Sequence, residues 1–208
     1  MKIKIIDNFL DKEDFNKLCS IELENINSNQ IKVYHNEINN NRVMKNNKIE
    51  KNFLKKLNDK YLDTAFKILR ELNPNKLKLY EYTDFTLIHT GSHCKFPIHD
   101  DTPNKLLSGV IYLSPKKNSG TIFYKNKNGE ERKEINWEQN RAVFFSREEK
   151  KTWHSYEGNK EKSRVALVYN LMTTKIKEVS KIENTNFIFS YLRFKLNPHL
   201  YRFLKFTI

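Results

Sequence analysis

The residues of this sequence whose types and spacing could do chemistry are His99, Asp101 and His154, followed by Arg164. Two imidazoles and a carboxylate can hold a metal ion while leaving coordination positions open. Arg164 stands ten residues after His154 and carries a permanent positive charge. The set therefore indicates a metal centre with a binding site for an anion.

The His-x-acid spacing proves little alone, because six histidines and 25 acidic residues in 208 positions give roughly 0.7 such pairs by chance. A second pair does occur, His35 with Glu37. It lies beside an asparagine run at residues 39–41, with no strand pattern around it. We interpret this second pair as a solvated loop and a chance match.

The pair at His99 has different surroundings. Residues 82–88 have the composition of a strand, Gly91 marks a turn, and residues 96–98 lead into the pair. In an extended segment, residues two apart share a face, so His99 and Asp101 should point the same way. Asp100 should point away, which makes Asp101 the better ligand.

The third ligand is expected from a hairpin. Residues 152–156 and 163–171 are strand-like, and the turn formers between them predict a hairpin that sets His154 directly opposite Arg164. Ala166 and Val168 would share the face of Arg164 and line a cavity if the sheet curls into a barrel. The large residues of this strand would pack outward against helices; these are Val165, Leu167, Tyr169 and Leu171.

Two histidines with one carboxylate form the ligand set typical of non-haem Fe(II) oxygenases. An arginine aimed into the same cavity offers a fork of donors matched to a carboxylate. The pattern favours an anionic co-substrate held by its far end, and a dicarboxylate fits that description.

At these residues the chain resembles the 2-oxoglutarate and Fe(II)-dependent oxygenases, and most closely their small prolyl-hydroxylase-like bacterial and phage members. The resemblance runs over most of residues 1–172. It begins at residues 5–10 with the helix-like segment 12–18, and continues through the segments 109–115, 120–124 and 141–145.

This resemblance implies that His99, Asp101 and His154 bind Fe(II) and that Arg164 pairs with the distal carboxylate of 2-oxoglutarate. Tyr112 would be a second contact to that carboxylate. His89 stands where family members often carry a tyrosine near the metal-proximal end of the co-substrate. The cofactors implied are Fe(II), 2-oxoglutarate and O2, with ascorbate as an optional reductant.

The implied reaction couples decarboxylation of 2-oxoglutarate, to succinate and CO2, with hydroxylation of a C–H bond. Asp101 fills the coordination site that halogenating relatives leave for chloride, which favours hydroxylation. The substrates considered are a protein side chain, an amino acid or a sugar-linked small molecule.

The predicted fold is mainly β, a double-stranded β-helix (jelly roll, cupin-like) in a single domain of residues 1–208. Residues 1–75 would form a helical N-terminal support on one face, since apolar residues recur at helical spacing between Phe53 and Leu72. Residues 76–172 alternate like the strands of a jelly-roll core. Residues 173–208 would form an aromatic and basic helical extension.

Composition bounds the partners and the compartment. Cys19 and Cys94 form no paired motif, and we expect neither a signal peptide nor a transmembrane segment, so the expected location is cytoplasmic. The net charge of +13 could attract a polyanion. Lysine and asparagine are abundant throughout, however, and no aromatic-interleaved basic stripe occurs, so we do not expect a nucleic acid partner.

Several alternatives stay open. The tail could lie on a membrane surface, cover the substrate mouth, dock a partner, or pack as a helical pair on the barrel or on a second subunit in a homodimer. The chain could also be a non-catalytic jelly-roll binding module. A nucleic-acid dealkylating oxygenase of the AlkB type ranks lower, because that pattern has a second arginine where this chain has Asn170.

Overall fold

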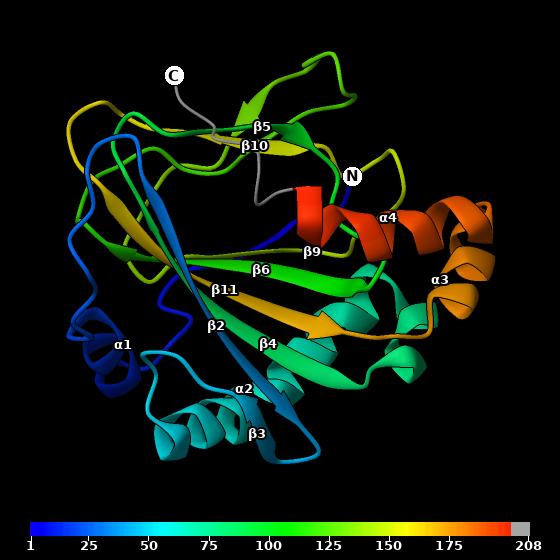
Figure 1. The fold of residues 1–208 in the computed structure, drawn as a ribbon, viewed down its shortest axis with the longest axis horizontal. Helices are drawn as coiled ribbons and strands as arrows, with labels where there is room; N and C mark the ends of the chain where they lie inside the picture. The colour runs from blue at the N-terminus through cyan, green and yellow to red at the C-terminus, as the bar shows by residue number, and fades with distance from the viewer. Residues whose placement is uncertain (201–208) are drawn as a thin grey trace.

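Two antiparallel β-sheets face each other in this computed structural model, which describes the main chain of residues 1–200 and the side chains of residues 1–196 (Figure 1). This is the mainly β, jelly-roll arrangement that the sequence predicts. The strands of the major sheet, in spatial order, are β1 (Lys4–Ile6), β9 (Ala142–Phe145), β6 (Lys105–Ser114), β11 (Arg164–Met172), β4 (Tyr82–Thr90), β2 (Ile31–Asn39) and β3 (Arg42–Lys45). Those of the minor sheet are β5 (Lys95–His99), β10 (His154–Glu157), β7 (Ile122–Phe123) and β8 (Lys133–Glu134).

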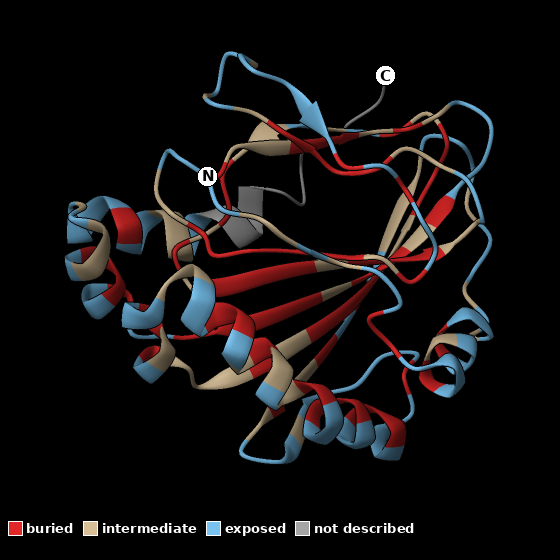
Figure 2. Ribbon diagram, turned by 180° about the vertical axis from the view of Figure 1, so that it is seen from behind, coloured by how far each residue is buried: buried red, intermediate tan, exposed pale blue. Residues whose placement is uncertain are grey.

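The helices before β4 cover the outer face of the major sheet, and two more helices follow β11, the last strand in the described chain. They are α1 (Lys12–Cys19), α2 (Lys51–Leu72), the 3-10 helix η1 (Pro74–Leu79), α3 (Ile176–Glu183) and α4 (Phe187–Leu200). The buried side of α2 packs with the outward residues of the major sheet in the main hydrophobic core (Figure 2). The predicted N-terminal helices are present. The predicted C-terminal helical extension, residues 173–208, contains α3 and α4, and its residues 201–208 lie outside the described residues. Within the described residues 1–200, no helix combines the length and apolarity needed to cross a bilayer.

The central strand β11 shows why the sheet has a cavity on one side and a core on the other. Ala166 and Val168 line the cavity between the sheets. Leu167, Tyr169 and Leu171 point the other way, into the main core. This alternation is the one predicted, and it follows from the period of two in an extended strand.

The connection between β10 and β11 differs from the predicted hairpin. His154 pairs with His99 of β5 and with Phe123 of β7, whereas Arg164 pairs with Thr90 of β4. The turn-rich residues after β10 therefore cross from the minor sheet to the major sheet. Gly158 permits the crossing, since a Cβ there would stand 2.1 Å from the main-chain oxygen of Ser92. The prediction that His154 lies directly opposite Arg164 in a hairpin is wrong.

The segment around His35 is also not a loop. It forms β2, and residues 1–75, predicted to form a helical support, also contain β1 and β3. Asn36 is fully buried, and its Nδ2 donates to the main-chain oxygen of Phe85 at 2.9 Å and to that of Tyr34 at 3.1 Å. The asparagine concealed the strand because its amide satisfies main-chain groups in a position that an apolar residue usually fills.

Candidate metal centre

Three side chains able to ligate a metal converge between the two sheets. His99 ends β5, His154 begins β10, and Asp101 follows β5 by two residues. One ligand atom from each lies within 4.8 Å of the others, and the two imidazole centroids are 4.3 Å apart. Among the residues that the structure describes, no other group of three such side chains converges in this way.

The protonation of both imidazoles suits metal binding. Nδ1 of His99 donates to the main-chain oxygen of Pro97, and Nδ1 of His154 to that of Thr152, each at 2.9 Å. Since a carbonyl oxygen can only accept, each Nδ1 carries the proton and each Nε2 is the unprotonated nitrogen, the one able to ligate a metal. Burial, with the repulsion of His154, lowers the pKa of His99 to about 4. Burial lowers the pKa of His154 as well.

The Asp101 carboxylate is held at both oxygens. Lys105 Nζ donates to Oδ1 at 2.7 Å, and Ser108 Oγ donates to Oδ2 at 2.6 Å. Burial alone would raise the pKa of Asp101, but Lys105 and the two imidazoles outweigh it and hold that pKa well below its usual range. The side chain therefore stays an anion. Asp100 turns away, as expected, and accepts from Thr152 Oγ1 at 2.8 Å.

The three residues open into a cavity of about 180 Å³ that Arg164 also lines. Arg164 Nη1 donates to the main-chain oxygen of Ser119 at 3.2 Å, and its Cζ lies 3.1 Å from the ring centroid of Tyr156. Burial lowers the pKa of Arg164, yet a guanidinium remains charged. Within the described chain its buried Nε has no partner and no carboxylate pairs with it. A buried charge without a counter-ion is costly, which points to an anionic ligand.

Tyr112 lies near Arg164, but its hydroxyl is already used. The ring stacks on Trp137 at 4.4 Å, and Arg164 lies over the same indole at 5.5 Å. The Tyr112 hydroxyl donates to Thr121 Oγ1 at 3.0 Å and accepts from the Thr121 main-chain N–H at 2.8 Å. Tyr112 is fully buried, and Thr121, not Tyr112, lines the cavity.

His89 is a second sequence-predicted site residue that does not line the cavity. Its neighbours Ile88 and Thr90 line the cavity, so the alternation along β4 puts His89 on the other face. There its Nε2 lies 3.3 Å from Ser163 Oγ.

Sequence reasoning missed Lys105, Ser108, Thr121 and Tyr156, all of which line the cavity. Two of them had a usable signal. Ser108 lies four residues before Tyr112 on one strand, and Tyr156 lies two residues after His154 on another, so each shares a face with a residue already singled out.

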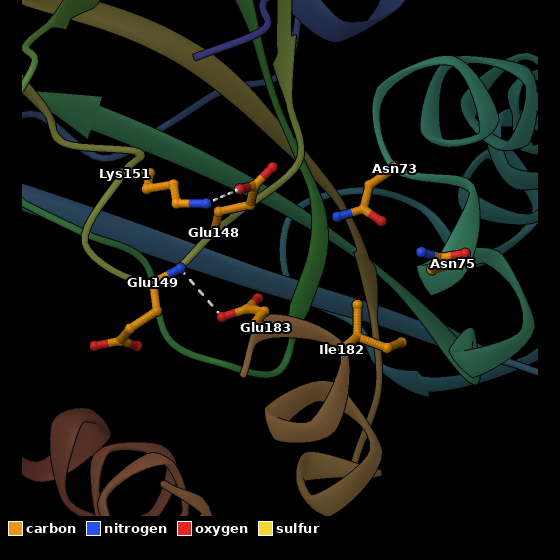
Figure 3. A pocket seen from close by; sticks show the side chains of 7 residues that line it. All are labelled: Asn73, Asn75, Glu148, Glu149, Lys151, Ile182 and Glu183. Carbon is orange, nitrogen blue, oxygen red and sulfur yellow. Dashed lines mark hydrogen bonds and ion pairs between the residues drawn. The ribbon is translucent and has the colours of Figure 1, made fainter. Parts of the chain in front are cut away.

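A second cavity, of about 170 Å³, lies where η1, α3 and the loop after β9 meet (Figure 3). Its acidic side chains are already paired. Glu183 pairs with Lys76 at 2.5 Å and with Arg147, and Glu149 pairs with Arg147 and Arg193. This cavity belongs to an ion-pair network that ties the C-terminal helices to the loop preceding His154.

Comparison with known proteins agrees with the fold. No family model matches the sequence, and no curated protein does. A 2OG-Fe(II) oxygenase family oxidoreductase from Burkholderia pseudomallei is similar with a TM-score of 0.59 at 13% identity, covering 82% of this chain and 84% of that one. A putative oxygenase from Shewanella oneidensis has a TM-score of 0.61 at 11% identity, with 95% and 90% covered. A Pseudomonas putida prolyl-4-hydroxylase has a TM-score of 0.53 at 13% identity, with 82% and 92% covered. The chain thus has the fold of the 2OG-Fe(II) oxygenases, and the predicted fold is confirmed.

Proposed function

We propose that this protein is an Fe(II)- and 2-oxoglutarate-dependent oxygenase that hydroxylates a C–H bond. The observation that carries the proposal is one cavity lined both by three converging metal-ligand side chains and by a buried arginine without a counter-ion. The donor set fits iron, because two neutral imidazoles and one carboxylate leave coordination positions open.

His99 and His154 would hold the iron through Nε2, and Asp101 through one carboxylate oxygen. Arg164 would pair with the far carboxylate of 2-oxoglutarate and satisfy its own Nε. Fe(II) and 2-oxoglutarate, when bound together, would allow O2 to hydroxylate a C–H bond while 2-oxoglutarate is converted to succinate and CO2. The apolar cavity residues keep water away from the reacting atoms; they include Ile88, Val110, Phe145, Ala166 and Val168.

The substrate we propose is a protein side chain, an amino acid or a sugar-linked small molecule. A nucleic-acid dealkylating enzyme ranks lower, because Asn170 occupies the position of the second arginine in that pattern. Asparagine is neutral, and the Nδ2 of Asn170 already donates to Asp84 Oδ2 at 2.9 Å. This position of β11 therefore offers no positive charge to a second anionic group.

The test is succinate release from 2-oxoglutarate by the purified protein with Fe(II), ascorbate and O2, without added substrate. His99→Ala and Arg164→Ala should both abolish turnover, while His93→Ala, a histidine outside the cavity lining, should retain it. Calorimetry without oxygen should show that His99→Ala loses the metal, whereas Arg164→Ala keeps the metal and loses 2-oxoglutarate. A wild-type protein that neither turns over nor binds Fe(II) and 2-oxoglutarate would reject the enzyme and favour the binding module.

A further inference from the structure

Helix α4 buries polar side chains and exposes several large apolar ones, unlike an ordinary surface helix. Such a helix buries its apolar stripe and exposes its polar face. In α4, Ser190 is only 3% exposed, and Arg193 reaches inward to both carboxylate oxygens of Glu149 at 2.7 and 2.6 Å. The outward side carries large apolar side chains: Ile188, Phe189, Leu192 and Leu196.

This exposed apolar surface is concentrated in one place. Of the ten large hydrophobic side chains exposed in the described chain, six lie on α4. Phe189 is 71% exposed and Ile188 is 65% exposed. A group of exposed apolar side chains of this kind marks a surface that binds another protein or a membrane.

The charge of this surface selects its partner. Lys195 is exposed among the outward apolar residues of α4. The last acidic residue of the chain is Glu183, and residues 184–208 contain four basic residues and no Asp or Glu. Apolar and aromatic side chains together with lysine or arginine, without acids, match the interface of a membrane with anionic headgroups.

A second copy of the chain fits this surface poorly. Self-association through α4 would bring two Lys195 ammonium groups into one apolar interface, and each chain carries a net charge of +13. Two like charges in an interface that excludes water oppose association. A bilayer accepts the lysine, because its long stem lets the ammonium reach the headgroups.

We propose that the outward face of α4 is a membrane-docking surface that lies in the interface of an anionic lipid bilayer. At 14 residues the helix is about 21 Å long, too short to span the hydrocarbon core. It would therefore lie in the plane of the interface. Because Arg193 ties α4 to the segment that carries Asp101, docking holds the cavity close to the lipid surface. This inference does not depend on the oxygenase proposal.

The experiment is sedimentation of the full-length protein with vesicles of phosphatidylcholine alone or mixed with phosphatidylglycerol. The test variant is Ile188→Ser/Phe189→Ser, and Lys195→Glu tests the charge. The matched control is Val33→Ser/Met44→Ser, which removes two exposed apolar side chains from β2 and β3. Circular dichroism and thermal melting check that each variant is folded.

We expect binding to the anionic vesicles that weakens at least about tenfold in the α4 double variant and is unchanged in the β2 and β3 control. Lys195→Glu should weaken it by several fold and reduce its salt dependence. The proposal is overturned by no vesicle binding, by equal binding to neutral vesicles, or by equal binding of the folded α4 variant. Light scattering that shows a dimer dissolved by the α4 double variant would also overturn it and assign the face to a second copy.

Discussion

Arg193 of the C-terminal helix donates from Nη2 to the main-chain oxygen of Asp101 at 3.2 Å, and to that of Asp100 at 3.1 Å. Arg147 Nε donates to the same Asp101 oxygen at 3.1 Å. The segment that carries a candidate metal ligand is thus held by arginines from two other parts of the chain. Helix α4 lies outside the jelly roll, yet it contacts the main chain of the site.

This relationship predicts that Arg193→Gln weakens metal binding although it touches no ligand atom. Loss of an outer contact that orients a ligand typically costs ten- to a hundredfold in metal affinity, and we expect about tenfold here because Arg147 still holds Asp101. Anaerobic calorimetry with Fe(II) measures the effect. Arg193→Lys keeps the positive charge but loses the forked guanidinium, so its Fe(II) affinity should lie between those of the wild type and Arg193→Gln. Arg70→Gln, an exposed arginine on α2, is the control, and equal affinities for Arg193→Gln and the wild type would contradict the prediction.

The Ser108 hydroxyl offers a second test of how Asp101 is oriented. Ser108→Ala removes the hydrogen bond to Oδ2 and should lower Fe(II) affinity by roughly ten- to a hundredfold while leaving the fold intact. Ser146→Ala is a matched control, since Ser146 is also a buried serine but donates to the main-chain oxygen of Leu106. If both variants bind Fe(II) alike, the hydroxyl does not orient the carboxylate.

The sequence predicted that two of the candidate ligands share a face because their geometry is local. His99 and Asp101 lie two residues apart in an extended segment, and a period of two is enough to put them on one face. The pairing of β10 is not local. The residues after Glu157 show where the strand ends, but whether the next strand joins the same sheet depends on contacts such as Gly158 against Ser92, which sequence spacing does not report.

The ion-pair network beneath the site was beyond sequence reasoning for the same reason. Lys76 and Glu183 stand 107 residues apart in the sequence, yet they form an ion pair in which the side chains are 0% and 3% exposed. Arg193 looked like one basic residue in an aromatic tail. Only the packing of α3 and α4 against the loop after β9 brings these charges together.

Glu183→Ala should therefore destabilise the fold strongly. It leaves Lys76 buried without its carboxylate and removes one of the carboxylates that pair with Arg147. Breaking a buried pair by removing one partner costs about 3 to 5 kcal/mol. Urea unfolding measures the free energy. Glu71→Ala is the comparison, because Glu71 pairs with Lys4 at the surface and should cost less than about 1 kcal/mol. Similar losses in the two variants would show that the buried network contributes little.

Arg164→Met separates the binding role of this arginine from a structural one. If Arg164 is a buried charge kept for an anionic co-substrate, replacing it with an apolar side chain of similar length should leave the free protein as stable or more stable.

The same variant should lose the rise in melting temperature that 2-oxoglutarate gives the wild type in the presence of metal, because its affinity for 2-oxoglutarate falls by roughly thirtyfold or more. Arg164→Lys should recover only part of that rise, since an ammonium lacks the fork that pairs with a carboxylate. Thermal melting with and without 2-oxoglutarate measures both quantities. A strong loss of stability in the free Arg164→Met protein, with the 2-oxoglutarate response unchanged, would instead make Arg164 a structural residue held by Tyr156 and Ser119.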